Sequence, residues 1–140
     1  MSVDMSPKPN IIFTYGTLRP GLGERPEAHA FRKAAKHIGP ATFQGKLYAI
    51  DWYPGVIDST DKDDIVIGDL FEISEDTGFF TKLDIYEMCS PDLPQPHEYI
   101  RTIRTVLAED RRIPAWIYLY NRTITDQTRI PTGDYADHVD

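Results

Sequence analysis

The stretch IIFTYGTLRPG, residues 11–21, joins a strand signal to a turn signal. Its first half is apolar and rich in β-branched residues, a pattern typical of a buried strand. The apolar run ends at Tyr15, and Gly16 and Pro20 then mark a turn. Such a turn either reverses the chain or presents successive backbone N–H groups to a small anion. The sequence therefore predicts a strand over residues 10–15 and a loop over residues 16–26.

Outward from this stretch, apolar and polar residues alternate in several later segments, which predicts further strands. These strands are expected at residues 43–49, 65–73 and 99–108; residues 52–57 are expected as a turn that leads into another short strand, and the apolar residues 113–120 as a last strand. Two segments instead have apolar residues at steps of three and four, which predicts helices. The helices are expected over residues 27–38, where Gly39-Pro40 would end the helix, and over residues 75–87.

This order of elements lacks the regular strand–helix alternation of a doubly wound sheet. Many alternating strands in a short chain favour a closed sheet. We therefore expect an α+β fold, a small mixed and mostly antiparallel β-barrel with flanking helices. With 140 residues, one domain is expected, over residues 10–122, between a flexible arm (1–9) and a polar C-terminal tail (123–140).

The composition narrows the class of partner. The formal net charge of −7 argues against nucleic acid or an anionic membrane as the main partner. No apolar run approaches the ~20 residues of a spanning helix, and the N-terminus lacks the apolar middle of a signal peptide. Cys89 is the one cysteine, so no internal disulfide forms. A cytoplasmic location is the expectation.

Several candidate sites compete on residue type alone. The glycine loop lacks the Lys-Ser/Thr of a phosphate-binding loop, and no His/Cys cluster has zinc spacing. Cys89 and His97 form a conceivable dyad, but a buried, inert thiol is the simpler interpretation. Glu87 stands among apolar neighbours at the end of the second predicted helix, so it is either turned outward to water or partly buried and functional.

The last predicted strand is apolar on both faces. The larger face carries Trp116, Tyr118 and Tyr120, and the smaller face carries Ala115, Ile117 and Leu119. One face is expected to cover the core. The other face either packs against a helix or lines a cavity, where tyrosine hydroxyls would orient a polar ligand.

Two separated motifs together resemble the signature of the gamma-glutamylcyclotransferase-like family. These are YGTLRPG (15–21) and the pair LDIYE (83–87) with YIR (99–101), with YPGVI (53–57) between them. Within the family, the compact members that act on gamma-glutamylamines are the most similar. The resemblance covers roughly residues 10–121, and the segment between Glu87 and Tyr99 is longer and richer in proline here.

The resemblance implies a function as well as a small mixed β-barrel. The α-amine of a gamma-glutamyl group would attack its own γ-carbonyl, release 5-oxoproline and expel an amine, with no cofactor and no metal. Glu87 is implied as the general acid/base, and the backbone of Tyr15, Gly16, Thr17 and Leu18 as the holder of the glutamyl head group.

Four more residues are expected to line the substrate site. Pro54 and Gly55 would shape the wall of the pocket, and Tyr99 and Tyr120 would hydrogen-bond the substrate from adjacent strands. Arg101 is a candidate to brace a carboxylate or the loop. Two other functions stay open: a non-catalytic module that binds a gamma-glutamyl or amino-acid ligand, and a hydrolase that depends on Cys89.

Overall fold

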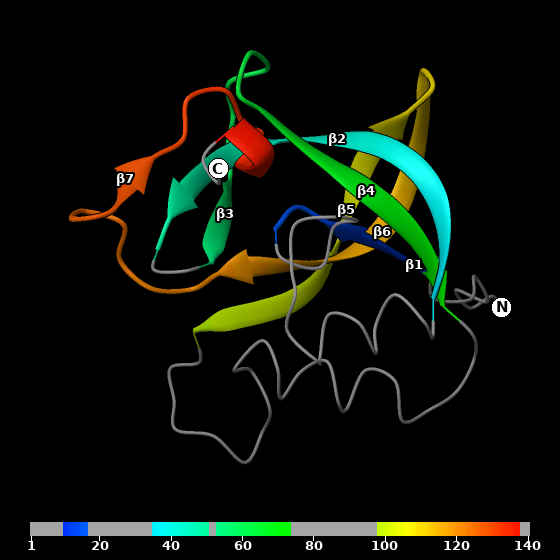
Figure 1. The fold of residues 1–140 in the computed structure, drawn as a ribbon, viewed down its shortest axis with the longest axis horizontal. Coiled ribbons are helices and arrows are strands. Elements are labelled where there is room, and N and C mark those ends of the chain that lie inside the picture. Colours follow the sequence, from blue (N-terminus) through cyan, green and yellow to red (C-terminus); the bar gives the residue numbers. More distant parts are fainter. Residues whose placement is uncertain (1–9, 17–34, 51–52, 74–97, 138–140) are drawn as a thin grey trace, which may run out of the picture.

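The computed structural model describes residues 10–16, 35–50, 53–73 and 98–137, which form one seven-stranded sheet (Figure 1). The elements are β1 (Ile11–Thr14), β2 (Ala35–Ala49), β3 (Pro54–Asp58), β4 (Ile65–Ile73), β5 (Tyr99–Ala108), β6 (Arg111–Tyr120), β7 (Thr128–Arg129) and the 3-10 helix η1 (Tyr135–Asp137).

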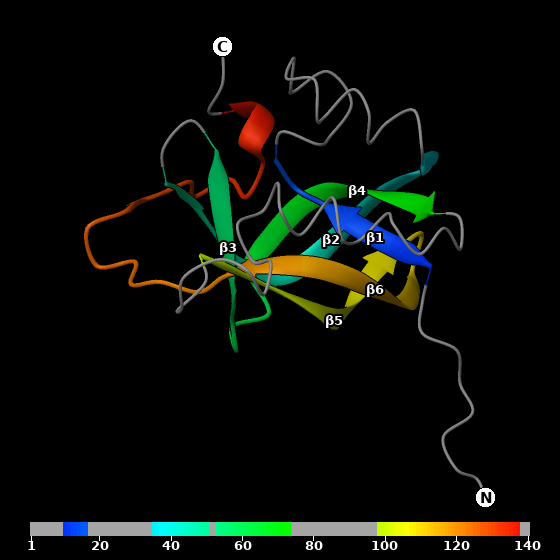
Figure 2. The same cartoon turned by 90° about the horizontal axis from the view of Figure 1, so that it is seen from below.

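Five of the strands close into a barrel in the order β2-β4-β1-β6-β5, because β2 pairs with β5 as well as with β4. The closing contact places Thr42 opposite Leu107. Strand β1 lies between β4 and β6 (Figure 2) and is parallel to β6, whereas the other described pairs are antiparallel. The predicted mixed, mostly antiparallel barrel is confirmed.

Strand β2 is long and strongly curved (Figure 1). Its residues 35–44 pair with β4 in the barrel, and its residues 45–49 pair with β3 and then with β7. One strand therefore carries both the barrel and a small extension of the sheet. The extension brings the start of β3, at Pro54, beside the end of β2.

Both faces of the barrel wall are apolar, as β6 illustrates. Ala115, Ile117 and Leu119 belong to the cluster inside the barrel, together with Phe13 and Leu70. The intervening Trp116, Tyr118 and Tyr120 belong to a second cluster on the outer face, with Ile12 and Phe71. The alternating residues of β6 are thus buried on both sides, as the sequence pattern predicts.

The helix expected over residues 27–38 is wrong for its last four residues. Residues 35–37 already belong to β2, where they pair with residues 71–73 of β4, and Ile38 is half exposed rather than part of a buried stripe. Hydrogen bonding to β4 outweighs the local helical spacing. Residues 27–34 and the expected helix 75–87 lie outside the described residues, so flanking helices stay a prediction.

Residues beyond 122, expected as a polar tail, contribute to the core. They supply β7 and η1, and the side chains of Ile130 and Tyr135 are buried in the inner cluster. Because the segment is mostly polar, its composition does not predict that these two side chains are buried. Within the described residues, no helix is long and apolar enough to cross a membrane.

Candidate functional site

Gly16 follows β1 and lies directly against the first residue of β3. A Cβ atom at Gly16 would stand 2.6 Å from Cγ of Pro54, closer than such atoms approach in proteins. The turn after β1 therefore approaches Pro54 only because position 16 has no side chain. Two segments that the sequence singled out separately, 15–21 and 53–57, meet at this contact.

Tyr99, at the start of β5, contacts the same first residue of β3. Its hydroxyl donates a 2.6 Å hydrogen bond to the carbonyl oxygen of Pro54, and its side chain is buried. The next residue, Gly55, lies against Tyr120, where an added Cβ would stand 2.9 Å from the tyrosine Cβ. Pro54 and Gly55, the first two residues of β3, are therefore held between two tyrosines.

These tyrosines belong to a row of three rings. Tyr99 and Tyr120 are directly opposite each other on β5 and β6, and their rings meet edge to face with centroids 5.5 Å apart. The ring of Tyr53 lies 6.2 Å from that of Tyr99. The predicted substrate residues Gly16, Pro54, Gly55, Tyr99 and Tyr120 are thus brought together by the end of β1 and the strands β3, β5 and β6.

The hydroxyl of Tyr120 is in an unusual position. The residue is 9% exposed, yet no other described residue hydrogen-bonds its side chain. Burial raises the pKa of Tyr120, the negative charge of Glu98 raises it further, and Arg122 partly offsets both. The phenol is therefore neutral at physiological pH and able to donate a hydrogen bond to a ligand.

Glu98 is a buried carboxylate beside these tyrosines that the sequence pattern does not reveal. It is a carboxylate with 7% exposure, and the hydroxyl of Tyr53 donates a short hydrogen bond to its Oε2 atom. By strand alternation Glu98 shares a face with Ile100, which is 46% exposed, so the pattern predicts a solvated side chain. Its burial depends on Tyr53, which the tertiary fold brings close.

The remaining predicted residues are less completely placed. Tyr15 is buried in the inner cluster, and its hydroxyl donates to the Tyr118 carbonyl oxygen at 2.6 Å, so its ring supports the barrel wall. Thr17, Leu18 and Glu87 lie outside the described residues. Cys89 and His97, the alternative dyad, also lie outside them.

Arg101 lies over an aromatic ring of the neighbouring strand. Its guanidinium carbon lies 4.7 Å from the centroid of the Trp116 ring on β6. This is cation–π geometry. Arg101 therefore packs on the outer face of the barrel, and a role in bracing the loop stays a prediction.

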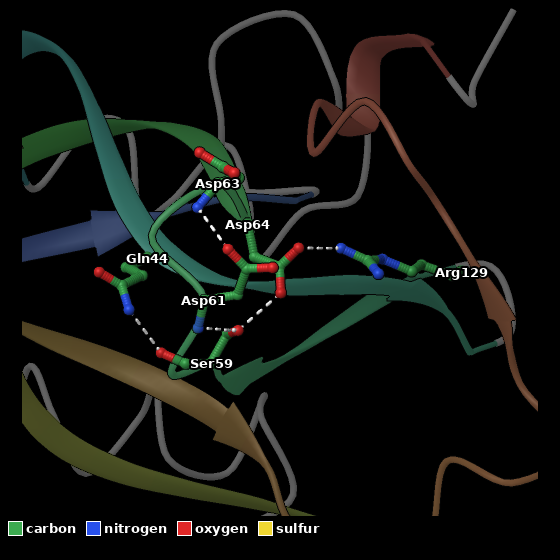
Figure 3. A network of polar contacts seen from close by, with 6 residues as sticks. All are labelled: Gln44, Ser59, Asp61, Asp63, Asp64 and Arg129. Carbon is green, nitrogen blue, oxygen red and sulfur yellow. Dashed lines mark hydrogen bonds and ion pairs between the residues drawn. The ribbon is translucent and has the colours of Figure 1, made fainter.

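The acidic loop between β3 and β4 is a separate polar network (Figure 3). Asp64 accepts a 2.6 Å hydrogen bond from Ser59 and a 2.7 Å bond from Arg129, and these contacts lower its pKa. The network ties the loop to β7. Among the described residues, no cluster of three His, Cys, Asp or Glu side chains could hold a metal ion.

Comparisons with known proteins agree on one family. The model of the family described as "Gamma-glutamyl cyclotransferase, AIG2-like" matches residues 12–137. A Vibrio cholerae protein named "Putative gamma-glutamylcyclotransferase" is 31% identical over 135 residues, which cover 93% of this chain and 98% of that protein.

Solved structures have the same fold. The chain resembles YkqA of Bacillus subtilis with a TM-score of 0.68 and 25% identity, covering 92% of this chain but 40% of YkqA. An AIG2-like protein of Mus musculus matches with a TM-score of 0.63 and 21% identity, over 85% of this chain and 82% of that one. The second likeness concerns the fold alone.

Proposed function

The chain belongs to the gamma-glutamyl cyclotransferase, AIG2-like family, and we propose that it releases 5-oxoproline from a gamma-glutamyl amine or amino acid. The α-amine nitrogen forms a bond to the γ-carbonyl carbon, the bond to the leaving nitrogen breaks, and that nitrogen gains a proton. The observation that carries the proposal is the meeting of Gly16 with Pro54 at the start of β3, where Tyr99 and Tyr120 contact Pro54 and Gly55.

The turn at Gly16 binds the anionic end of the substrate. Without a side chain at position 16, the backbone N–H groups that follow can approach a carboxylate or a developing oxyanion. This local site is compatible with an acidic protein, because nearby N–H dipoles outweigh a distant net charge. The side-chain-free approach of Gly16 to Pro54 supports this role.

Glu87 acts as the general base and then as the general acid. An unperturbed Glu has a pKa of about 4.3 and an α-amine about 7.7–8.0, so proton transfer is uphill by roughly 5 kcal/mol. Apolar surroundings raise the carboxyl pKa and reduce this mismatch. Since the attack is intramolecular, the substrate itself supplies most of the proximity.

Tyr120 orients the reacting group. Its buried hydroxyl has no hydrogen-bond partner among the described residues, so a substrate oxygen would satisfy it. Tyr99 differs, because its proton is already donated to the Pro54 carbonyl oxygen. We therefore assign Tyr120 to the substrate and Tyr99 to positioning Pro54 and Gly55 at the start of β3.

The test is 5-oxoproline release by Glu87→Gln, which keeps the shape of the side chain and removes its basicity. We expect kcat to fall by about 100-fold or more, the usual contribution of a general acid/base. Glu72→Gln, which removes the same charge at an exposed position on β4, is the matched control and should retain activity. Equal turnover by the two variants would refute the assignment of Glu87.

A further inference from the structure

Two side-chain hydrogen bonds join the residues around the start of β3 to those around the start of β5. The hydroxyl of Tyr53 donates to Oε2 of Glu98, and the hydroxyl of Tyr99 donates to the carbonyl oxygen of Pro54. Two consecutive residues of one segment thus hold two consecutive residues of the other. Glu98 and Tyr99 are 7% and 3% exposed, so both are largely removed from water.

The backbone on each side of the Tyr53–Glu98 bond is also hydrogen-bonded. The N–H of Asn121 donates to the carbonyl oxygen of Glu98 at 2.7 Å, which continues the pairing of β5 with β6 beyond Tyr99 and Tyr120. The N–H of Ile50 donates to the carbonyl oxygen of Tyr53 at 3.1 Å. The Glu98 carboxylate therefore connects the end of the β2–β3 loop to the β5–β6 pair.

The segment that this bond holds is the one on which the proposed site depends. Pro54 meets Gly16, and Gly55 lies against Tyr120 where the start of β3 adjoins the end of β6 (Figure 1). An added Cβ would stand 2.6 Å from Pro54 in the first contact and 2.9 Å from Tyr120 in the second. Because both contacts are this close, a displacement of Pro54 or Gly55 would also displace the Gly16 turn or the Tyr120 ring.

We infer that Glu98 is a positioning residue for the proposed cyclisation: through the hydroxyl of Tyr53, it fixes Pro54 and Gly55 against the Gly16 turn and Tyr120. The inference rests on the proposed function for the reaction, and it requires no contact between Glu98 and the substrate. A carboxylate suits this role, because a charged acceptor makes a stronger hydrogen bond than a neutral one. This bond offsets part of the free energy that burial of the charge costs.

A second contact between β3 and β5 supplies a matched control. At the opposite end of β3, the two carboxylate oxygens of Asp58 each accept a 2.9 Å hydrogen bond from the guanidinium group of Arg104. This pair joins the same two strands, but both side chains are exposed and lie away from the start of β3. Loss of activity through loss of the Tyr53–Glu98 bond alone would therefore indicate positioning of the site rather than general support of β3.

The first test is steady-state release of 5-oxoproline from a gamma-glutamyl amine. Tyr53→Phe and Glu98→Leu each remove the hydrogen bond. We expect each to lower kcat by about tenfold and to change KM by less than about threefold, because the substrate still binds but is less well oriented for attack. Glu98→Gln keeps a neutral oxygen acceptor and should lower kcat by only about threefold. Arg104→Gln should leave both constants unchanged.

The double variant Tyr53→Phe/Glu98→Leu tests whether the two residues act as one unit. Its kcat should be no lower than that of either single variant, because both substitutions remove the same contact. Losses that multiply to about 100-fold would mean that the two residues act independently. That result, an unchanged kcat in Glu98→Leu, or an equal loss in Arg104→Gln would overturn the inference.

Amide hydrogen exchange distinguishes failure of this inference from failure of the proposed function, because it needs no turnover. The N–H of Ile50 is bonded to Tyr53, so NMR should detect its exchange as about tenfold faster in Tyr53→Phe and Glu98→Leu but unchanged in Arg104→Gln. If exchange is faster and the native chain releases no 5-oxoproline, the reaction is wrong and the fixing of Tyr53 by Glu98 holds. Unchanged exchange, or faster exchange with unchanged kcat in an active enzyme, would refute the positioning role.

Discussion

At the scale of single residues, Gly16 joins the two segments of the site. A side chain at this position would meet Cγ and Cδ of Pro54 at 2.6 and 2.8 Å. We expect Gly16→Ala to raise KM for a gamma-glutamyl substrate by about tenfold or more. The added Cβ would push the turn after β1 away from Pro54, and the substrate would then be less well positioned. Steady-state kinetics measure the change.

The compensating variant makes this prediction specific. Pro54→Ala removes the two ring atoms that an added Cβ would meet. In the Gly16→Ala background it should recover part of the lost affinity, and circular dichroism should show that the three proteins are folded. A double variant that binds no better than Gly16→Ala would contradict the role of this contact.

The pKa of Tyr120 depends on the charges of Glu98 and Arg122. Because the negative charge of Glu98 raises the pKa of Tyr120 and Arg122 lowers it, two neutralising variants should act in opposite directions. Glu98→Gln should shift the pKa of the phenol down, and Arg122→Gln should shift it up. Titration of the tyrosine Cζ resonances by NMR, with Tyr120→Phe to assign the signal, measures both shifts. Shifts of the same sign would contradict the assigned electrostatics.

The carboxyl group of Asp64 makes the stability of the fold depend on pH. Ser59 is the first cause of its lowered pKa, and Arg129 is the second. A carboxyl whose folded pKa is depressed stabilises the fold above its unfolded pKa of about 3.9, and this contribution is lost as the pH falls through the folded pKa. Ser59→Ala should therefore raise the pKa of Asp64 and lower the stability chiefly at neutral pH.

Denaturation at a series of pH values tests this expectation. The stability difference between the native chain and Ser59→Ala should decrease as the pH falls from neutral to about 2. Ser59→Thr retains the hydroxyl and is the control. A difference that is the same at all pH values would assign the effect of Ser59 to its other hydrogen bond, with the Asp61 backbone N–H.

At the scale of elements, the β5–β6 hairpin has a strained turn. Ala108 pairs with Arg111, so Glu109 and Asp110 form a two-residue loop, and their φ angles are 50° and 65°. Two central residues with positive φ are typical of a type I′ turn, which favours Asn-Gly. The sequence pattern predicts β5 and most of β6, but it does not reveal the tight turn between them.

Replacing the loop by Asn-Gly should stabilise the protein. The variant with Glu109→Asn and Asp110→Gly is expected to raise the free energy of unfolding by about 1 kcal/mol, because glycine adopts positive φ without steric strain. Chemical denaturation measures this change. Asp126→Gly, at a position without positive φ, should instead be neutral or destabilising, and an equal gain there would contradict the role of backbone strain at the turn.

At the scale of the whole molecule, the C-terminal segment completes the core. Ile130 and Tyr135 are 5% and 2% exposed and lie in the inner cluster with residues of β1, β2 and β6. The backbone N–H of Ile130 also donates to the carbonyl oxygen of Leu47 at 2.8 Å. The segment after β6 is therefore part of the barrel domain in space.

Truncation of these anchors should destabilise the entire barrel. Ile130→Ala is expected to lower the free energy of unfolding by about 2–4 kcal/mol, since it leaves a cavity in a packed core. Ile38→Ala is the matched control, because Ile38 is 50% exposed and its loss should change stability by less than about 0.5 kcal/mol. Thermal or chemical denaturation distinguishes the two, and equal losses would place Ile130 outside the core.

Local pattern was sufficient for much of this architecture. Alternation in residues 65–73 and 99–108, and the apolar run at residues 113–120, predict strands that the structure contains as β4, β5 and β6. Alternation with a period of two is specific to strands, because successive strand side chains point to opposite faces of the sheet. The same logic failed at residues 35–38, where pairing with β4 decides the conformation.

The sequence by itself determined most of the strands and the barrel class, and it singled out Gly16, Pro54-Gly55, Tyr99 and Tyr120, because periodicity, turn chemistry and motifs are local properties of the chain. Only the tertiary structure decided the burial of Glu98 and the inclusion of Ile130 and Tyr135 in the core. Both depend on neighbours distant in sequence: Tyr53 reaches Glu98 across 45 residues. The tertiary fold decides which side chains are shielded from solvent, and the local sequence pattern does not contain this information.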